Sequence, residues 1–207
     1  MVTKVTSGMT DGVVVATEKS LANPSSKPGS GSANKVAILN AEGNLDDHYL
    51  PSYVGQWRLT VDFAIGTSEA IVANTWEKVD TSVQGTGVGS HMAQTSGTFT
   101  FPETGKWMVE FHGRVTKNSA DVAVIAADLF ATTGSGGSTE VRVAQSWGSV
   151  ATAGTNDTLC MSSMIDVTNV SDNKVKIKLS AGNSGADLKG NSTFNLTYLT
   201  FTRLGAT

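Results

Sequence analysis

Residues of the kinds that build disulfides, metal clusters and active sites are scarce in this sequence. It contains a single cysteine, Cys160, and three histidines among 207 residues. One cysteine cannot form an internal disulfide or a cysteine-based metal cluster, and we expect it to be a small buried apolar residue, as free cysteines commonly are. The sequence also lacks a His-Glu-x-x-His pair, a Gly-x-Ser-x-Gly turn and a glycine-rich phosphate loop. We therefore expect neither enzymatic activity nor a cofactor.

One short cluster offers ligands of the right type for a cation. Asp46, Asp47 and His48 together supply two carboxylates and an imidazole. Three adjacent residues rarely converge on one ion without further oxygen ligands from elsewhere in the chain. We therefore expect no bound metal.

Positive charge is also scarce. The chain has 15 Lys and Arg against 18 Asp and Glu, a formal net charge of −3. Without an excess of basic residues it cannot neutralise a phosphate backbone or an anionic bilayer, so we expect neither nucleic acid nor a membrane as a partner. There is no apolar run of about 18 residues that could cross a bilayer, and the first residues do not resemble a signal peptide. We expect a protein made in a cytoplasm.

The residues that are abundant favour β structure. Only 16% of the residues are charged, whereas glycine occurs 22 times. The surface must then be covered largely by Thr, Ser, Asn and Gly, which is typical of short strands joined by tight turns. A chain of this length can bury a core of its own. The composition predicts an all-β protein.

Residues 1–56 differ from the rest of the chain. A Pro-, Gly- and Ser-rich stretch at 23–32 has no means of burying itself. A short apolar run follows it and ends in a turn before Pro51. We predict an extended arm that anchors the protein to a partner. The anchoring residues that we predict are Val13, Val14, Val15, Ile38 and Leu39.

Residues 57–207 show apolar side chains in a period of two, separated by turn residues, as expected for a β-sandwich. Alternation in Lys174 to Leu179 predicts one core face and one lysine face, which would also protect a sheet edge. From Val122 to Phe130 both faces are apolar, which suggests that another subunit covers the second face. The predicted strands are Trp57 to Ile65, Ala70 to Val79, Thr98 to Phe101, Lys106 to Thr116, Asp121 to Ala131, Glu140 to Trp147, Thr158 to Val167, Lys174 to Ser180 and Thr193 to Leu204.

Two stretches resemble signatures of the complement-component-1q and tumour-necrosis-factor-like superfamily. The first is a Gly-x-Phe-x-x-Pro-x-x-Gly segment that leads into an aromatic-rich strand, and the second is a Ser-Thr-Phe run before the last strand. The residues that carry them are Gly97, Phe99, Pro102 and Gly105, and then Ser192, Thr193 and Phe194. The likeness covers roughly residues 57 to 205. It implies a jelly-roll β-sandwich that forms a homotrimer.

The arm carries a second resemblance. Residues 35–51 contain Leu-Asn-Ala-x-Gly-x-Leu-Asp followed by Leu-Pro. This stretch is similar to the connector that precedes the β head in many bacteriophage fibre and head-decoration proteins. Together the two resemblances imply a trimeric head held on a virus particle by its arm, although likeness of fold does not fix function.

One strand face is our candidate for the trimer contact. Glu110, His112 and Arg114 share a face and would stack along a threefold axis if their strand lines it, so that opposite charges of neighbouring subunits could pair. A solvated outer face is the alternative, and Met108 and Glu110 stand where the family often has aromatic residues. The predicted interface residues are Met108, Glu110, His112, Arg114 and Phe201.

Three functions remain open at this point. The first is a capsid decoration or head-fibre protein on the virion surface, with its arm bound to the major capsid protein or another virion protein. The second is the receptor-binding tip of a tail fibre that recognises host surface glycan; it predicts aromatic loop tips, and only Trp147 lies near a loop. The third, a glycan depolymerase, needs a paired-carboxylate cleft that the sequence does not reveal.

Overall fold

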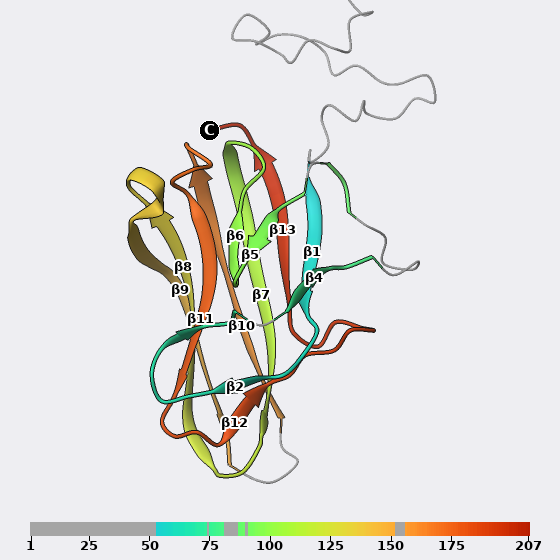
Figure 1. Ribbon diagram of the computed structural model, residues 1–207, viewed down its shortest axis with the longest axis vertical. Helices are drawn as coiled ribbons and strands as arrows, with labels where there is room; N and C mark the ends of the chain where they lie inside the picture. The colour runs from blue at the N-terminus through green and yellow to red at the C-terminus, as the bar shows by residue number, and fades with distance from the viewer. Residues whose placement is uncertain (1–52, 74, 81–86, 90, 152–155) are drawn as a thin grey trace, which may run out of the picture. The chain divides into compact units, whose positions relative to one another are not determined.

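From Tyr53 onward the chain folds into two antiparallel β-sheets packed face to face (Figure 1). The computed structural model describes residues 53–73, 75–80, 87–89, 91–151 and 156–207. The predicted arm up to residue 52, its anchoring residues and the Asp46 to His48 cluster lie outside the described residues. No helix in the described part of the chain is long and apolar enough to cross a membrane.

The first sheet is organised around its longest strand, β7. Strand β10 pairs along almost the whole of one edge of β7, while β13 and β12 share the other edge, and β1 and β4 extend the sheet beyond β13. Strand β2 joins through β12. The strands are β1 (Val54–Leu59), β2 (Phe63–Ile65), β4 (Trp76–Lys78), β7 (Gly105–Lys117), β10 (Asn156–Val167), β12 (Ala186–Leu188) and β13 (Tyr198–Gly205).

The second sheet has the order β5-β6-β11-β8-β9, and β3 also pairs with β11. The chain alternates between the sheets, since β7, β10 and β13 of the first sheet are separated in sequence by strands of the second. This alternation gives a jelly roll, which confirms the predicted fold class. The strands are β3 (Ala70–Ile71), β5 (Ala93–Thr95), β6 (Thr98–Thr100), β8 (Val122–Thr133), β9 (Thr139–Val150) and β11 (Lys174–Ala181), with a 3-10 turn η2 (Ser135–Gly137) between β8 and β9.

Aromatic rings from both sheets meet in the core. Phe99 lies 5.3 to 5.7 Å, centroid to centroid, from Phe201, Trp57 and Trp76. Phe201 has no exposed area. This corrects its prediction as an interface residue: it alternates with outward-facing neighbours along β13 and packs between the sheets.

Tyr53 fixes the start of the sandwich. Its ring is buried against Trp107, its hydroxyl accepts a hydrogen bond from the Met92 N–H at 3.3 Å, and burial raises the pKa of the phenol. Residues 53–56, which the sequence analysis assigned to the arm, therefore belong to the sandwich.

Several predicted strands are shorter or interrupted. The stretch Thr193 to Leu204 becomes strand only from Tyr198, because the Asn191 side-chain oxygen accepts the N–H groups of Thr193 and Phe194 and holds a turn there. Turns likewise divide the first two predicted strands into β1 and β2 and into β3 and β4. The short strands β5 and β12 were not predicted.

The outward face of the second sheet carries a layer of paired charges. Glu140 accepts hydrogen bonds from Lys176 at 2.6 Å and Lys178 at 2.5 Å, and Glu69 lies 3.3 Å from both Lys178 and Arg142. Strand β11 is inside the sheet, so its lysines pair with carboxylates and do not guard an edge. We call this set the charged layer; its members are Glu69, Asp128, Glu140, Arg142, Lys176 and Lys178.

The charged layer also explains the two apolar faces of β8. Phe130 points outward but is buried, because Lys178 Nζ lies 4.3 Å and the Arg142 guanidinium 5.5 Å from the centre of its ring. Long cationic side chains shield the ring with their aliphatic stems. At Phe130 the same chain therefore provides the cover, whereas Val124 on the same side of β8 stays 44% exposed, and its cover by another subunit stays a prediction.

Candidate functional site

The outward face of the first sheet carries an apolar row as well as charged side chains such as the Lys106–Asp166 pair. We call the surface formed there by β10, β7, β13 and β1 the front face. Its first row crosses the four strands at their paired positions and holds Met164, Met108, Thr202 and Val54. Met164 is 58% exposed and Val54 is 36% exposed. Two methionines and a valine in one row make an adaptable apolar strip.

The second row of the front face is mostly uncharged, and hydrogen bonds fix some of its side chains. The Gln56 amide donates to the Thr200 hydroxyl at 3.0 Å and accepts from Asn195 at the same distance. Beside them stands Glu110, the single charged residue of the row, with Ser162 as its neighbour on β10. In the described part of the chain Glu110 forms no ion pair.

The third row places aromatic and sulfur-containing side chains together. The rings of His112 and Tyr198 stack at 4.9 Å with 11° between their planes, and Cys160 Sγ lies 3.3 Å from His112 Nδ1. Cys160 is exposed, which corrects the expectation that it is buried. It lies on the outward side of β10 because its neighbours Leu159 and Met161 fill the core.

A buried arginine with two exposed carboxylate partners lies at the other end of this row. Arg58 is almost fully buried, with its Nε 2.5 Å from Glu77 and its Nη2 3.5 Å from Asp80. The guanidinium also donates to the Thr193 carbonyl at 3.4 Å, so the segment before β13 is pinned against the sheet. A buried arginine of this kind is neutralised within the chain and is not available to a partner.

The front face is hollowed between β7 and its edge strand β10. A shallow depression of about 210 Å³ is lined by Glu110, His112, Cys160, Met161 and Ser162. A thiol beside an imidazole can act as a nucleophile when a third group orients the base. Among the described residues no carboxylate is hydrogen-bonded to the His112 ring, and no three His, Cys, Asp or Glu side chains gather as a metal site.

Four of the five predicted interface residues share this face. Met108, Glu110 and His112 are half-buried and Arg114 is exposed, all on the outward side of β7. Arg114 Nε donates to Asn156 at 3.3 Å. The sequence analysis missed the residues that β10, β13 and β1 contribute, because they are brought to the face by pairing between distant strands. The missed residues are Val54, Gln56, Cys160, Met164, Tyr198 and Thr202.

A second hollow lies at the open side of the sandwich, between the edge strands β9 and β10. It measures about 260 Å³ and its apolar lining includes Val141, Val143 and Met164. Val141 and Met164 are both substantially exposed. We call this surface the edge groove. It adjoins the front face at Met164, which belongs to both.

Comparison with known proteins identifies the fold. No protein-family description and no curated protein matches the chain. Among solved structures, Eiger TNF from S. frugiperda matches with a TM-score of 0.54 and 10% identity, covering 76% of this chain and 95% of that one. Murine APRIL at pH 5.0 matches with a TM-score of 0.52 and 10% identity, covering 73% of this chain and 98% of that one. The sandwich is a TNF-like jelly roll.

Proposed function

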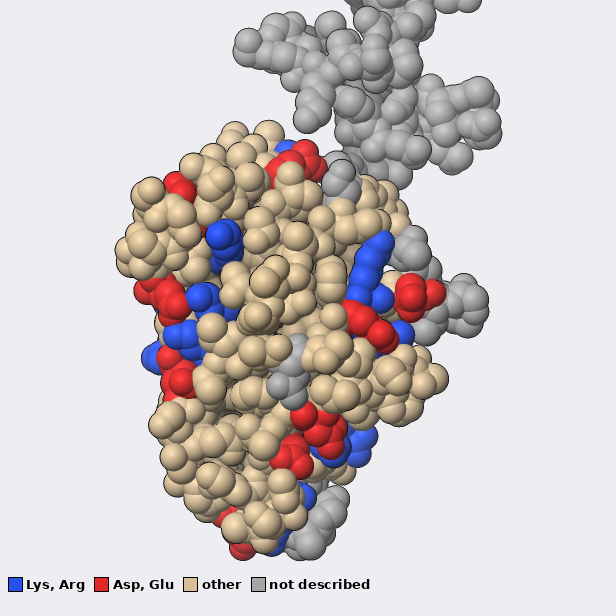
Figure 2. Space-filling view, viewed as in Figure 1, with Lys and Arg blue, Asp and Glu red and all other residues tan. Residues whose placement is uncertain are grey.

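We propose that the sandwich is the trimeric head of a virion structural protein, a capsid decoration or head-fibre protein, and that its subunits meet through the front face. The observation that carries this proposal is the contrast between the two outward faces. The second sheet neutralises its own charges within one chain, whereas the first leaves an apolar strip open. Figure 2 shows blue and red side chains intermixed along the left flank, on the side where Figure 1 places β8 and β9.

The contrast has an energetic meaning. A solvated sheet face gains from charged side chains, and the charged layer supplies them on the second sheet. The strip with Met164 and Val54 instead leaves apolar area in contact with water. Burying that area against a partner is favourable by about 25 cal/mol per Å². The front face is therefore a surface that gains free energy when a partner covers it.

Two different surfaces favour a closed ring. The front face is a sheet surface and the edge groove is the side of the sandwich. A twofold dimer would need one patch that is complementary to itself, whereas a contact between these two different patches does not. Contacts between two unlike patches generate rings when the rotation closes. We infer that the edge of one subunit, with Val141 and Met164, packs on the front face of the next.

The remaining charges on β7 fit the same arrangement. In the described part of the chain neither Glu110 nor Arg114 has an ion-pair partner, although they have opposite signs and share one strand face. Across a threefold axis the carboxylate of one subunit can meet the guanidinium of its neighbour. Such a pair fixes the register of the subunits more than it adds stability.

The position on a virus particle is supported by residues 35–51 alone, whose similarity to phage connectors was given above and which lie outside the described residues. A second candidate function is the receptor-binding tip of a tail fibre. The exposed Trp147, which stands on strand β9 and not on a loop, favours it.

The assembly is tested by changing the apolar strip. Met108→Asp places a carboxylate in the centre of the front face, and we expect light scattering to show a monomer where the unchanged protein shows a trimer, with the same β circular dichroism. Val61→Asp, at an exposed turn between β1 and β2, is the matched control and should leave a trimer. A monomeric unchanged protein would sink the proposal.

The virion role needs a separate experiment. A chain that begins at residue 52 keeps Tyr53 and the whole of β1. It should remain trimeric, yet it should no longer bind virus particles that lack this protein. Copy counting by gel densitometry on purified virions distinguishes the candidates, because a decoration protein is present in hundreds of copies and a fibre tip in a few dozen. Retained binding by the shortened chain would argue against anchoring by the arm.

A further inference from the structure

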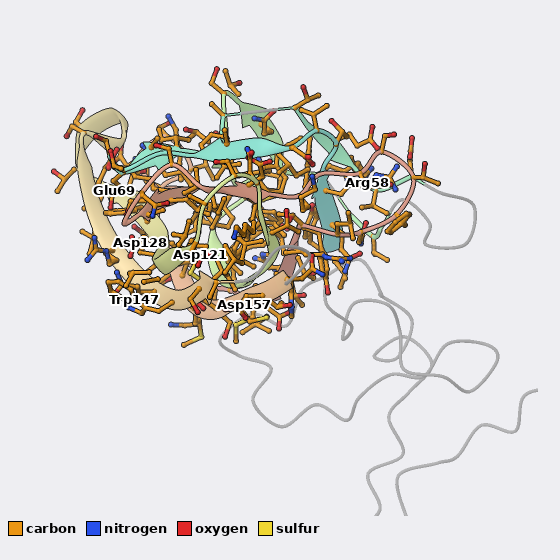
Figure 3. The ribbon with its side chains drawn as sticks, turned by 90° about the horizontal axis from the view of Figure 1, so that it is seen from below. Arg58, Glu69, Asp121, Asp128, Trp147 and Asp157 are labelled. Atoms are coloured by element: carbon orange, nitrogen blue, oxygen red, sulfur yellow. The ribbon has the colours of Figure 1, made fainter. Side chains whose placement is uncertain are left out.

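Trp147 stands apart from the other tryptophans of the chain. It is 62% exposed on β9, whereas Trp76 and Trp107 are buried in the core and Trp57 is partly buried. Figure 3 shows Trp147 beside Asp128 on one side of the sandwich, with Arg58 on the opposite side. An indole left in water on a regular strand, away from the front face, calls for a physical reason.

A chain of hydrogen bonds holds this indole in place. Trp147 Nε1 donates to Gln145 Oε1 at 2.9 Å, and Gln145 Nε2 donates to Asp128 Oδ1 at 2.7 Å. The same Asp128 oxygen lies 2.8 Å from Arg142 Nε. Because both ends of the Gln145 amide are used, the amide cannot turn over without breaking one of these bonds. The indole ring is thus tied to the rigid sheet through its N–H.

The base of this chain is a carboxylate that is costly to bury. Asp128 is 1% exposed although it points to the outward side of β8. An ionised group at such a position must be hydrogen-bonded and paired, or it destabilises the fold by several kcal/mol. A threonine or serine at this position would be compatible with the strand and would not require an ionised group to be buried. What the carboxylate adds is the orientation of Gln145 and Arg142, and through Gln145 the orientation of Trp147.

The surroundings define what could bind. The Gln145 amide contacts the indole, the half-exposed Arg142 guanidinium binds the same Asp128 oxygen as Gln145, and the Ser180 hydroxyl stands two strands away in the row of Trp147. Trp147 lines neither hollow of the described structure. A small apolar ligand needs a concave pocket, so an open aromatic face with polar neighbours does not suit one.

We propose that Trp147, oriented by Gln145 and Asp128, is a stacking site for a pyranose ring of a saccharide. A pyranose has a C–H face that packs on an aromatic ring and hydroxyl groups at its rim that bond to amide and guanidinium groups. Fixing the indole in advance lowers the entropy that binding costs. The inference deepens the second candidate function, recognition of a surface glycan, and the site is complete within one chain, so its test does not need the trimer.

Iodide quenching of tryptophan fluorescence gives a direct test, since Trp147 is the most exposed indole among the described residues. The probes are chitohexaose, maltohexaose and mannohexaose at millimolar concentration, added to the full chain. We expect at least one of them to protect the fluorescence from iodide and to shift the Trp147 indole N–H signal in NMR.

Three variants complete the test. Trp147→Ala removes the fluorescent reporter, so affinity is compared by isothermal titration calorimetry, and the variant should bind about tenfold more weakly or worse, as expected for the loss of an aromatic contact. Gln145→Ala leaves the ring free to turn and should weaken binding by a smaller factor. Phe194→Ala removes a similarly exposed ring from the turn before β13 and should change nothing. A proline-rich peptide is the comparison probe. The proposal fails if no hexasaccharide protects Trp147, if only that peptide does so, or if Trp147→Ala binds as before.

Discussion

At Gly190 the chain passes so close to the turn between β1 and β2 that a side chain has no room. A Cβ atom there would lie 2.4 Å from backbone atoms of Val61. The approach is held by Asp62, whose carboxylate accepts the Gly190 N–H at 2.9 Å and pairs with Lys189. Burial acts to raise the pKa of Asp62, but the hydrogen bonds from Lys189 and Gly190 outweigh it and lower that pKa. The contact joins the start of the sandwich to the segment before β13.

Gly190→Ala is therefore expected to lower the free energy of unfolding by about 1 to 3 kcal/mol, as overpacking does. Gly66→Ala is the matched control, because a Cβ at Gly66 meets nothing within 4 Å, and it should change the stability by no more than about 0.5 kcal/mol. Urea unfolding followed by circular dichroism measures both. Equal effects of the two substitutions would contradict the close approach.

Single residues also show where sequence reasoning succeeded and failed. Alternation along β7 placed Trp107, Val109 and Phe111 in the core, and all three are fully buried. For Cys160 we relied on the general burial of cysteine, although the alternation of its own strand puts it outward. Phe201 lies on the same side of β13 as Leu199, and this alternation predicts that Phe201 is buried in the core. For both residues the alternation along the strand predicted burial better than residue type or family likeness did.

At the scale of elements, the charged layer gives the second sheet a defined pH dependence. The pKa of Glu140 is lowered, chiefly by the hydrogen bonds that it accepts from Lys176 and Lys178, and the pKa of Lys178 is raised, chiefly by the hydrogen bond that it donates to Glu140. The contribution of Glu140 is present above its ordinary pKa of 4.5 and is lost as the pH falls through the lowered value. The contribution of Lys178 is present below 10.5 and is lost as the pH rises through the raised value.

Glu140→Gln should consequently reduce the free energy of unfolding by about 0.5 to 1 kcal/mol near neutral pH, since the pairs are partly screened by water. The difference from the unchanged protein should shrink below the lowered pKa of Glu140 and above the raised pKa of Lys178. Chemical unfolding across this range of pH measures the difference. A constant difference at every pH would mean that the carboxylate acts through packing and not through charge.

The sequence revealed most strands but not their neighbours. The period of two found the long strands β7, β8, β10 and β11 to within a few residues. It could not find β5 or β12, which are only three residues long and carry no clear alternation. The cover over Phe130 was assigned to another subunit because cross-strand pairing with Arg142 and Lys178 is not visible in the local sequence.

At the scale of the whole molecule, the proposed assembly predicts a charge exchange. Glu110→Arg or Arg114→Glu alone would bring like charges together across the axis, and each should weaken association by about 1.5 kcal/mol or more. The double variant restores opposite signs and should recover much of the loss. Melting temperature as a function of protein concentration reports association. No recovery in the double variant would place the two side chains outside a shared contact.

The front face itself was only partly accessible to sequence reasoning. Met108, Glu110, His112 and Arg114 could be grouped because they alternate along one strand. The partners that complete the surface come from β10, β13 and β1, which are dozens of residues away in the chain. Only the pairing registers, such as His112 opposite both Cys160 and Tyr198, bring them together.

Strands β1 and β13 lie side by side, with Val54 opposite Thr202, so the chain enters the sandwich and leaves β13 at the same end (Figure 1). The hairpin between β7 and β8 lies at the opposite end. The loop between Lys117 and Val122 is therefore the site farthest from both ends of the described chain, so a peptide inserted there should leave Tyr53 and Thr207 undisturbed.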